Sequence, residues 1–464
     1  MLDISRGAFP ADVAFACRGK LIYEGSKKIK GASIDSRAVK DGDVFVAIKG
    51  ERSDGHSYIN VAAEKGAGCV FVENTPSDLS VFEKNGCSVI LCENSSLALA
   101  NLSREHKKEC KALTIGVTGS VGKTTTRQFI ASVLASRFNT HKTEGNFNNA
   151  LGLPLTVMKL SASHEAAVIE MGMSAKGEIS FLTRIAMPDI AVITTIGSSH
   201  IEHLGSREGI RDAKMEIVEG LKEGGKLVLN GDEPLLADYN GAIYVSLHNE
   251  SSHYRAVDLK YTPQGMKFDA VTPSRIIKDC IIPTLGEHTV LDAMFAVAIG
   301  DICSLNDDEI KKGLISFEGV GMRQNIQVVN GITYIHDYYN ASPESIKASL
   351  NVTCKLAESA CGRTIAVIGN VLELGEMSEQ LHRSVGEYVS NSKVDLLFTF
   401  GNDAMYIADE AIKRGFNKDK AFVFTDIADP KPIADAIRKN IMQNDCILIK
   451  ASHGIDMKRI ADLL

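Results

Sequence analysis

The sequence predicts an α/β protein of three domains: a small N-terminal α/β domain, a central domain with a mostly parallel sheet, and a C-terminal Rossmann-like domain. Three observations predict this fold class. The chain has 464 residues, more than one hydrophobic core usually accommodates. Short apolar runs alternate with helix-compatible segments over most of its length. A glycine-rich turn at residues 116–122 links an apolar run to a helical pattern. We expect the domains at residues 1–110, 111–319 and 320–464.

The composition indicates a globular, cytoplasmic protein. Hydrophobic residues make up 44% of the chain and charged residues 23%, and the net charge is −7. This negative charge argues against nucleic acid or an anionic membrane as the main partner. No apolar segment is long enough for a membrane span, and the first residues lack the apolar core of a signal peptide. The ten cysteines contain no Cys-x-x-Cys pair, so we expect reduced and mostly buried thiols.

The first domain is predicted from apolar runs at residues 32–37, 43–48 and 68–72, with a helix-compatible segment at 58–65. Polar side chains follow the first run, where they could hold the polar groups of a ligand. These side chains are Ser33, Asp35, Ser36 and Arg37. On spacing alone, a turn with a surface ion pair is the favoured interpretation. A polar, helix-prone segment at residues 94–112 leads into the second domain.

The central domain begins with a phosphate-binding pattern. The apolar run at residues 113–117 predicts a buried strand, and apolar residues between 129 and 134 recur at helical spacing. Between them lie Gly119, Ser120, Gly122 and Lys123, followed by Thr124 and Thr125. Glycines allow backbone amides to close around an anion, the lysine reaches the outer phosphates, and a threonine hydroxyl can bind Mg²⁺. An ordinary glycine-rich turn is the less favoured interpretation, so we expect the chain to bind a nucleoside triphosphate.

Further candidates follow this loop in the central domain. Glu170 ends an apolar run at residues 166–171, so it can hold Mg²⁺ at the carboxyl edge of the sheet. His200 follows the next apolar run, at residues 190–196. A lone histidine there is more often structural, but its neighbours favour a metal or phosphate role. Asn146 and Asn149 either contact a polar ligand or satisfy loop backbone. By composition alone, Lys214 is an ordinary surface lysine.

The C-terminal domain shows the strand–helix pattern again. We expect strands at residues 331–336, 363–368, 395–400, 421–425 and 446–450, and helices at 342–360, 376–389 and 404–414. This alternation predicts an open, mostly parallel sheet with helices on both faces. The polar residues Asp337, Asn340, Asn370 and Ser452 lie at the predicted carboxyl ends of strands. Closing this edge onto the central domain would expel water from a reactive intermediate.

The order of these motifs resembles the Mur ligases over nearly the whole chain. The matching segments lie at residues 34–37, 54–56, 118–124, 146–149, 170–172, 200–206, 213–216, 337–343, 373–375 and 448–452. The resemblance implies an ATP- and Mg²⁺-dependent ligase that forms an amide bond through an acyl phosphate. In detail, the chain is similar to members that add D-alanyl-D-alanine to UDP-N-acetylmuramoyl tripeptide during peptidoglycan synthesis. It also implies a monomer with mobile domains.

The resemblance assigns roles that spacing cannot assign. It implies that Lys123 and the loop amides hold ATP phosphates, and that Thr124, Glu170, His200 and a carbamate on Lys214 hold Mg²⁺. It places His288 and Asp292 near the adenine, and brings Arg323 and Asp337 to the terminal phosphate. It implies that substrate contacts come from Ser33, Asp35, Ser36, Arg37, Asn146, Asn149, Asn340, Lys450 and Ser452.

Several residues depart from the family pattern, mostly where the incoming amine or the adenine would lie. These are Thr289, Asp292, His336, Ser342, Asn370, Ala451 and His453. The departures leave open a paralogue that joins a different amine. The sequence is also compatible with a P-loop kinase or nucleotide hydrolase, with an enzyme like folylpolyglutamate synthase, and with a binding protein without ligase activity.

Overall fold

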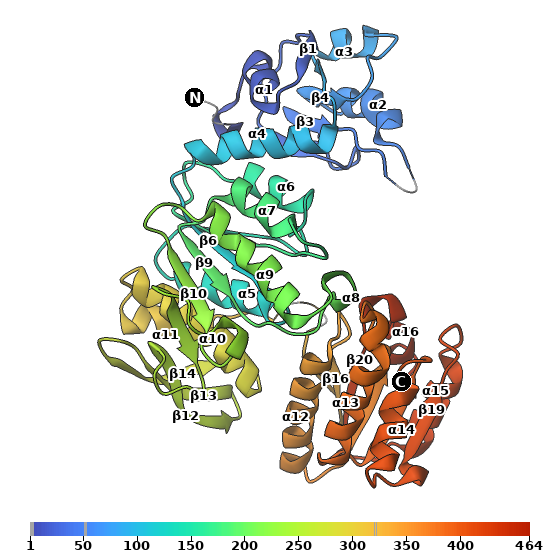
Figure 1. Ribbon diagram of the computed structural model, residues 1–464. Helices are drawn as coiled ribbons and strands as arrows, with labels where there is room; N and C mark the ends of the chain where they lie inside the picture. The colour runs from blue at the N-terminus through green and yellow to red at the C-terminus, as the bar shows by residue number, and fades with distance from the viewer. Residues whose placement is uncertain (1–3, 51–52, 320, 322) are drawn as a thin grey trace.

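Three sheets follow one another along the chain in the computed structural model, which describes residues 4–50, 53–319, 321 and 323–464. They have five, nine and six strands. The central domain lies between the N-terminal and C-terminal domains (Figure 1). The three-domain α/β fold is therefore confirmed. The expected boundary at residue 320 lies outside the described residues.

The N-terminal sheet has the strand order β1-β5-β4-β3-β2. Strands β2 to β5 are parallel, and β1 pairs with β5 in the antiparallel direction. The strands are β1 (Lys20–Tyr23), β2 (Gly31–Ser33), β3 (Asp43–Val46), β4 (Cys69–Val72) and β5 (Ser88–Leu91). The helices are α1 (Pro10–Cys17), α2 (Ile59–Glu64), α3 (Ser80–Asn85) and α4 (Ser95–Glu109). The three predicted strands and the helix at 58–65 correspond to β2, β3, β4 and α2.

Helix α4 joins the first domain to the second. Its buried His106 accepts a hydrogen bond from the amide of Ile4, at 3.3 Å. The other ring nitrogen lies 3.0 Å from the carbonyl oxygen of Leu160, which belongs to the central domain. Helix α4 also packs against α6 (Gly152–Met158) and α7 (Glu178–Ala186). One helix therefore anchors the N-terminal domain on the central one.

The central sheet has the order β14-β13-β12-β11-β10-β9-β6-β8-β7. Strands β6 to β12 are parallel, and β13 and β14 extend the sheet as an antiparallel edge that the sequence analysis did not anticipate. The strands are β6 (Leu113–Thr118), β7 (Thr140–Lys142), β8 (Ala166–Glu170), β9 (Ile190–Ile193), β10 (Lys226–Asn230), β11 (Ile243–Ser246), β12 (Tyr254–Thr262), β13 (Gly265–Val271) and β14 (Ile276–Ile282).

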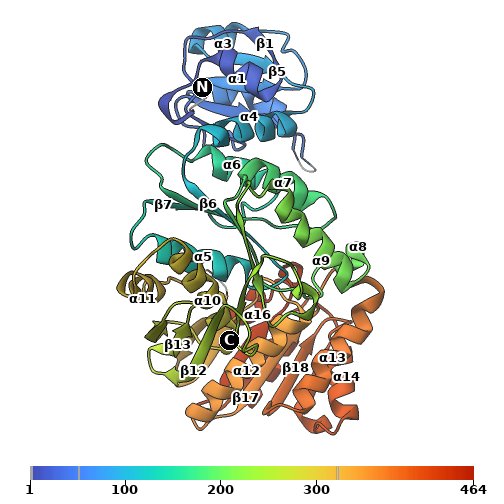
Figure 2. The ribbon, with the colours of Figure 1, turned by 60° about the vertical axis from the view of Figure 1, so that its left-hand side comes forward.

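Helices cover both faces of this sheet. One face packs against α5 (Lys123–Leu134), α10 (Glu287–Ile302) and α11 (Asp307–Ile315), and the other against α6, α7 and α9 (Arg207–Met215) (Figure 2). Alternate residues of β8 enter the two cores: Ala166 and Val168 on one side, Ala167 and Ile169 on the other. Burial on both faces explains why this strand is an uninterrupted apolar run.

The C-terminal sheet has the order β15-β16-β20-β17-β18-β19, and it is parallel except for β15. Its strands are β15 (Asn325–Val329), β16 (Ile332–His336), β17 (Thr364–Gly369), β18 (Leu396–Phe400), β19 (Ala421–Phe424) and β20 (Cys446–Lys450). Its helices are α12 (Pro343–Ser359), α13 (Ser378–Ser390), α14 (Met405–Lys413), α15 (Lys431–Asn440) and α16 (Lys458–Ala461). The five predicted strands are confirmed, whereas β15 was missed.

Two expectations from composition can be compared with the structure. Six of the ten cysteines are buried, in agreement with mostly buried thiols. Within the described ranges, no helix combines the length and apolar character needed to cross a lipid bilayer.

Candidate active site between the central and C-terminal domains

The loop between β6 and α5 has a tight backbone of the kind that close approach to a phosphate requires. Gly119 and Gly122 have φ values of 151° and 85°, which disfavour other residues. A Cβ atom at Gly119 would lie 1.9 Å from the Thr194 hydroxyl, and one at Gly122 would lie 2.5 Å from a carboxyl oxygen of Asp292. Helix α5 starts at Lys123, directly after this loop. Backbone and helix N-terminus can therefore approach an anion closely.

The side chains of the loop also fit a polyphosphate. The Lys123 ammonium group donates to the carbonyls of Gly119 and Ser120, at 2.7 and 3.3 Å, so it lies over the loop. Burial lowers the pKa of Lys123 to about 8. The Ser120 hydroxyl is buried and has no hydrogen-bond partner among the described residues. A phosphate oxygen would accept hydrogen bonds from both the Lys123 ammonium group and the Ser120 hydroxyl.

Thr124 and Glu170 meet beside this loop. In the parallel pairing of β6 and β8, Glu170 lies opposite Val117, and the Thr124 hydroxyl donates to its carboxylate at 3.2 Å. The carboxylate also pairs with Arg127 at 3.1 Å and accepts from Asn148 at 2.8 Å. Hydroxyl and carboxylate oxygens are the ligands that Mg²⁺ prefers next to substrate phosphates. These donors therefore fit a metal ion at the predicted sheet edge.

Lys214 is not the surface residue that its local sequence suggests. It is only 2% exposed, and burial together with the charge of Lys123 keeps its pKa well below the ordinary value. Helix α9 turns Ile210, Ala213 and Lys214 toward the core. These positions are three and four residues apart, which is the signal that could have indicated burial.

His200 lies where the central and C-terminal domains meet. It precedes α8 (Ile201–Leu204) as its N-cap residue, with a φ of 63°, and its imidazole contacts the carboxylate of Glu373 in the C-terminal domain. Burial lowers the pKa of His200, while the nearby Glu373 carboxylate partly opposes this shift. The backbone of Glu373 also accepts a hydrogen bond from the amide of Glu202, at 3.3 Å.

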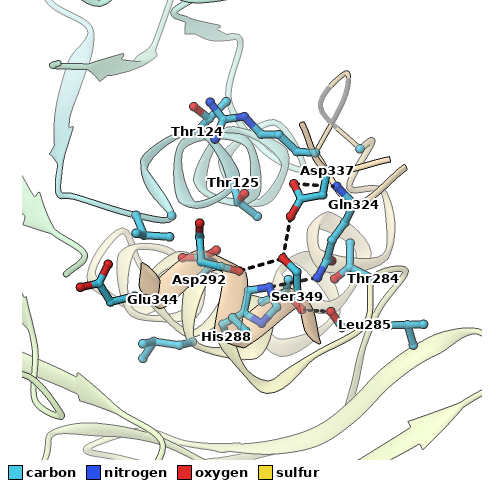
Figure 3. A pocket seen from close by; sticks show the side chains of 18 of the residues that line it. Thr124, Thr125, Thr284, Leu285, His288, Asp292, Gln324, Asp337, Glu344 and Ser349 are labelled. Carbon is cyan, nitrogen blue, oxygen red and sulfur yellow. Dashed lines mark hydrogen bonds between the residues drawn. The ribbon is translucent and has the colours of Figure 1, made fainter. Parts of the chain in front are cut away.

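A cavity of about 1420 Å³ opens between these two domains. It brings the phosphate loop together with the carboxyl edge of the C-terminal sheet (Figure 3). The predicted site residues that line it are Ser120, Gly122, Lys123, Thr124, Thr125, His288, Asp292, Arg323, Asp337, Asn340 and Lys450. The predicted residues outside its lining are Gly119, Glu170, His200, Lys214, Ser452, Asn146, Asn149 and the four of the N-terminal domain.

Asp337 is the centre of a polar network in this cavity. Its carboxylate accepts hydrogen bonds from Lys450 at 2.8 Å, from Ser349 at 2.6 Å and from the amide of Gln324 at 3.3 Å. The Gln324 side chain also contacts His288, at 3.1 Å (Figure 3). Ser349 and Gln324 could not be predicted from the sequence, because nothing local marks a serine inside a helix or a glutamine before an edge strand as part of a site.

Two further cavity residues have unusual surroundings. The Arg323 guanidinium lies 4.4 Å from the centre of the Tyr339 ring. Asp292 accepts a hydrogen bond from the Thr126 hydroxyl at 2.8 Å, and burial raises its pKa to about 8. Burial likewise lowers the pKa of His288 to about 4. His288 is therefore uncharged at neutral pH, and Asp292 is largely protonated there.

Four departures from the family pattern have local structural roles. Ser342 caps α12 by accepting from the amide of Ser345, at 3.2 Å. Asn370 accepts from the amide of Ala404, at 2.8 Å. Buried Ala451 packs where a Cβ at Gly369 would come within 2.7 Å of it, so the space beside Gly369 is small. The His336 ring stacks on Tyr334, at 6.1 Å between ring centres.

The N-terminal candidates form the exposed turn that spacing favoured. Arg37 pairs with Asp35 at 2.9 Å, and the Ser33 hydroxyl donates to the Asp35 carbonyl at the same distance. In the next domain, Asn149 accepts from the amide of Gly152 at 2.8 Å, at the start of α6, while Asn146 is exposed. These residues lie apart from the cavity.

A phosphate loop facing the polar edge of a second α/β sheet across one cavity is the arrangement expected of an ATP-dependent ligase. Family models match the chain in three parts: "Mur ligase family, catalytic domain" at residues 28–107, "Mur ligase middle domain" at 117–300, and "Mur ligase, glutamate ligase domain" at 322–453. The chain belongs to the Mur ligase family.

Relatives and solved structures agree with this assignment. The chain is 40% identical to UDP-N-acetylmuramoyl-tripeptide–D-alanyl-D-alanine ligase of Bacillus subtilis, over 93% of this chain and 92% of that protein. It is 30% identical to the Haemophilus influenzae protein of the same name, over 95% and 94%. Its structure resembles MurF from Acinetobacter baumannii, with a TM-score of 0.86, 27% identity and 98% of both chains covered. It also resembles MurF from Thermotoga maritima in complex with ADP, with a TM-score of 0.80, 28% identity, and 93% and 96% covered.

Proposed function

We propose that the chain uses ATP to join D-alanyl-D-alanine to UDP-N-acetylmuramoyl tripeptide, a step of peptidoglycan precursor synthesis. The observation that carries the proposal is the cavity that unites the phosphate loop with Asp337 and Arg323 of the C-terminal domain. The relatives of the same name and the ADP-bound structure of MurF support it. Because both walls of the cavity come from one chain, we expect a monomer to be active. We place the reaction in the cytoplasm, where ATP and nucleotide-linked sugars are available.

The reaction needs a better leaving group than water. The substrate carboxylate attacks the terminal phosphorus of ATP, giving an acyl phosphate and ADP, and the amine then displaces phosphate. Both steps gather negative charge on neighbouring oxygens. Lys123 and the amides of residues 119–122 would hold the phosphates, and Arg323 would approach the transferred group from the C-terminal domain. These groups act by positioning and electrostatics, so no covalent enzyme intermediate is needed.

Mg²⁺ would be held by Thr124 and Glu170, which already touch each other. When bound, it would neutralise phosphate charge. Lys214 would contribute as a carbamate, since carbamate formation requires an uncharged amine and its surroundings disfavour the ammonium form. His200 would complete that part of the site.

We assign the three domains, at residues 1–110, 111–319 and 320–464, to the uridine diphosphate, ATP and amine substrates respectively. Ser33, Asp35, Ser36 and Arg37 would contact the diphosphate end. The muramoyl part would lie near Asn146 and Asn149. Asn340, Lys450 and Ser452 would belong to the amine side, and His288 and Asp292 to the adenine side.

A panel of amines tests this proposal. The protein is incubated with ATP, Mg²⁺ and UDP-N-acetylmuramoyl tripeptide, and the products are weighed after addition of each amine. We expect D-alanyl-D-alanine to be joined in preference to single amino acids, with phosphate release requiring both acid and amine. Preferential joining of another amine would identify a paralogue, and phosphate release without any amine would identify a hydrolase.

A further inference from the structure

Five acidic side chains line the cavity between the central and C-terminal domains. Three of them already have a cationic partner: Glu233 pairs with Arg207 at 2.9 Å, Asp337 with Lys450 at 2.8 Å, and Glu358 with Lys393 at 3.1 Å. Asp292 is buried against the Thr126 hydroxyl and is largely protonated at neutral pH. The fifth, Glu344, has no cationic partner within the described part of the chain.

Glu344 extends across the boundary between the two domains. It follows Pro343 in the first turn of α12. Its carboxylate accepts a hydrogen bond from the Ser198 hydroxyl of the central domain, with the two carboxylate oxygens at 3.0 and 3.2 Å from the Ser198 oxygen. The side chain of Glu344 is exposed to the cavity, on the opposite side from Gln324 and Thr284 (Figure 3).

The carboxylate also lies close to the phosphate loop. A Cβ atom at Gly197 would be 3.1 Å from Glu344 Oε2 and 3.2 Å from Ser120 Cβ, so only Gly197 separates the two side chains. The buried Ser120 hydroxyl, which has no partner in the described residues, belongs to the same wall. The cavity thus has an unpaired anion immediately beside the place expected for the terminal phosphate.

The charge and the free acceptor sites of the Glu344 carboxylate determine which chemical group it can bind. A carboxylate offers about four acceptor sites and no donor, and the single Ser198 hydroxyl leaves most of them free. Phosphates and carboxylates would be repelled, whereas an ammonium group supplies a positive charge and three N–H donors. The incoming amine carries its positive charge on the reacting nitrogen itself, whereas ATP carries none at its terminal phosphate.

We propose that Glu344, oriented by Ser198, binds the ammonium group of the incoming amine and holds its nitrogen beside the phosphate loop. This inference rests on the proposed ligase function and adds to it the residue that determines recognition of the nucleophile. Because Ser198 and Glu344 come from different domains, this subsite exists only when the domains are together. Amine binding therefore favours the closed cavity.

Steady-state kinetics of Glu344→Gln tests the proposal, with Glu379→Gln as the control, an exposed carboxylate on α13 outside the cavity lining. Loss of a charge-assisted contact raises the KM for D-alanyl-D-alanine by about tenfold or more. The KM values for ATP and for the UDP-linked peptide stay within about twofold. Glu344→Asp keeps the charge and recovers part of the affinity. Glu379→Gln leaves all three KM values unchanged. An unchanged KM for the dipeptide in Glu344→Gln overturns the inference.

Two further readouts separate recognition of the amine from a structural role. Hydroxylamine is uncharged near neutral pH and traps acyl phosphates, so its product should form equally fast in Glu344→Gln and the wild type. N-acetyl-D-alanyl-D-alanine lacks the ammonium group, and its inhibition constant should be the same for both proteins. Loss of hydroxylamine trapping in the variant would show a role in the first step and overturn the inference. A wild type that neither traps hydroxylamine nor joins any amine would instead contradict the proposed function.

Discussion

At the scale of single residues, two side chains beside the phosphate loop have charge equilibria set by burial. Lys123 and Asp292 both have a pKa of about 8, reached from opposite directions. Desolvation disfavours the charged form in each case, which is a cation for lysine and an anion for aspartate. A bound triphosphate would reverse the shift of Lys123, because its oxygens stabilise the ammonium form.

Replacing Lys123 by alanine removes the only side-chain cation in the loop itself. We expect ligation to slow by about 10²–10³, equivalent to roughly 3–4 kcal/mol of transition-state stabilisation. Phosphate release in the presence of acid and amine measures this rate. Lys413→Ala, an exposed surface change on α14, serves as control and should leave the rate unchanged. Near wild-type turnover by Lys123→Ala would contradict the role of the lysine.

Asp292→Asn should change how the stability of the protein depends on pH. The folded-state pKa of about 8 lies above the ordinary value of 3.8, so the folded state keeps a proton that the unfolded state releases. This contribution to stability is complete below about pH 4 and is lost as the pH rises toward 8. Asparagine preserves the acceptor for Thr126 without any ionisation. The melting temperature of the variant should therefore exceed that of the wild type at pH 8 and approach it at pH 4; equal differences at both pH values would contradict this account.

Site residues that belong to one contiguous motif were predictable from the sequence. Site residues that come together only when distant segments fold against each other were not. The phosphate loop was predictable because strand, glycines, lysine and helix occur within fourteen residues. Ser349, Gln324 and Glu344 acquire their contacts only when α12 and the segment before β15 meet the central domain. Lys214 was misjudged for the same reason, since its burial depends on what covers α9.

At the scale of elements, the position of the phosphate-loop helix depends on its packing against α11. Gly313 of α11 lies so close to α5 that a Cβ there would be 2.3 Å from the Val133 Cα atom. The hydrophobic core between α5, α10, α11 and the sheet surrounds this contact. Close approach of two helix backbones requires glycine at this point.

Gly313→Ala should therefore separate the two helices and destabilise the protein. Overpacking of a dense core typically costs about 1–3 kcal/mol, more than the helix-propensity gain of about 1 kcal/mol for alanine. Urea unfolding should show a lower midpoint, and the KM for ATP should rise as α5 moves. Lys312→Ala, one position earlier on the same helix, is the control. A midpoint equal to or above that of the wild type would show that the backbones tolerate the methyl group.

The predictability of elements followed their hydrophobic patterns. Parallel strands buried on both faces, such as β8 and β20, appear as uninterrupted apolar runs and were predicted. Strand β15 is exposed at every position, and β12 alternates polar and apolar residues. Such strands at or near an antiparallel edge carry a weaker signal, because their pairing depends on neighbours distant in sequence.

At the scale of the whole molecule, one buried apolar cluster and several polar contacts join the central and C-terminal domains around the cavity. The polar contacts include that of the His200 imidazole with the Glu373 carboxylate and the hydrogen bond of Ser198 to Glu344. A third is the cation–π contact of Lys355, whose ammonium lies 5.3 Å from the Tyr261 ring centre. Such polar contacts at a domain boundary are individually weak. We expect this arrangement to be in equilibrium with a more open one, since three substrates must enter the cavity.

Glu373→Ala should shift this equilibrium toward the open form. Glu373 holds the α8 segment twice, through its carboxylate to His200 and through its carbonyl to the amide of Glu202, and only the first contact is lost on substitution. A single polar contact at such a boundary contributes up to about 1 kcal/mol, so the open population should rise by at most about fivefold. Small-angle scattering of the unliganded protein should show a larger radius of gyration, and hydrogen exchange should increase at residues 197–204. Glu376→Ala, in the neighbouring exposed turn, should leave both unchanged. Scattering and exchange identical to the wild type would show that the C-terminal domain is held by contacts other than this one.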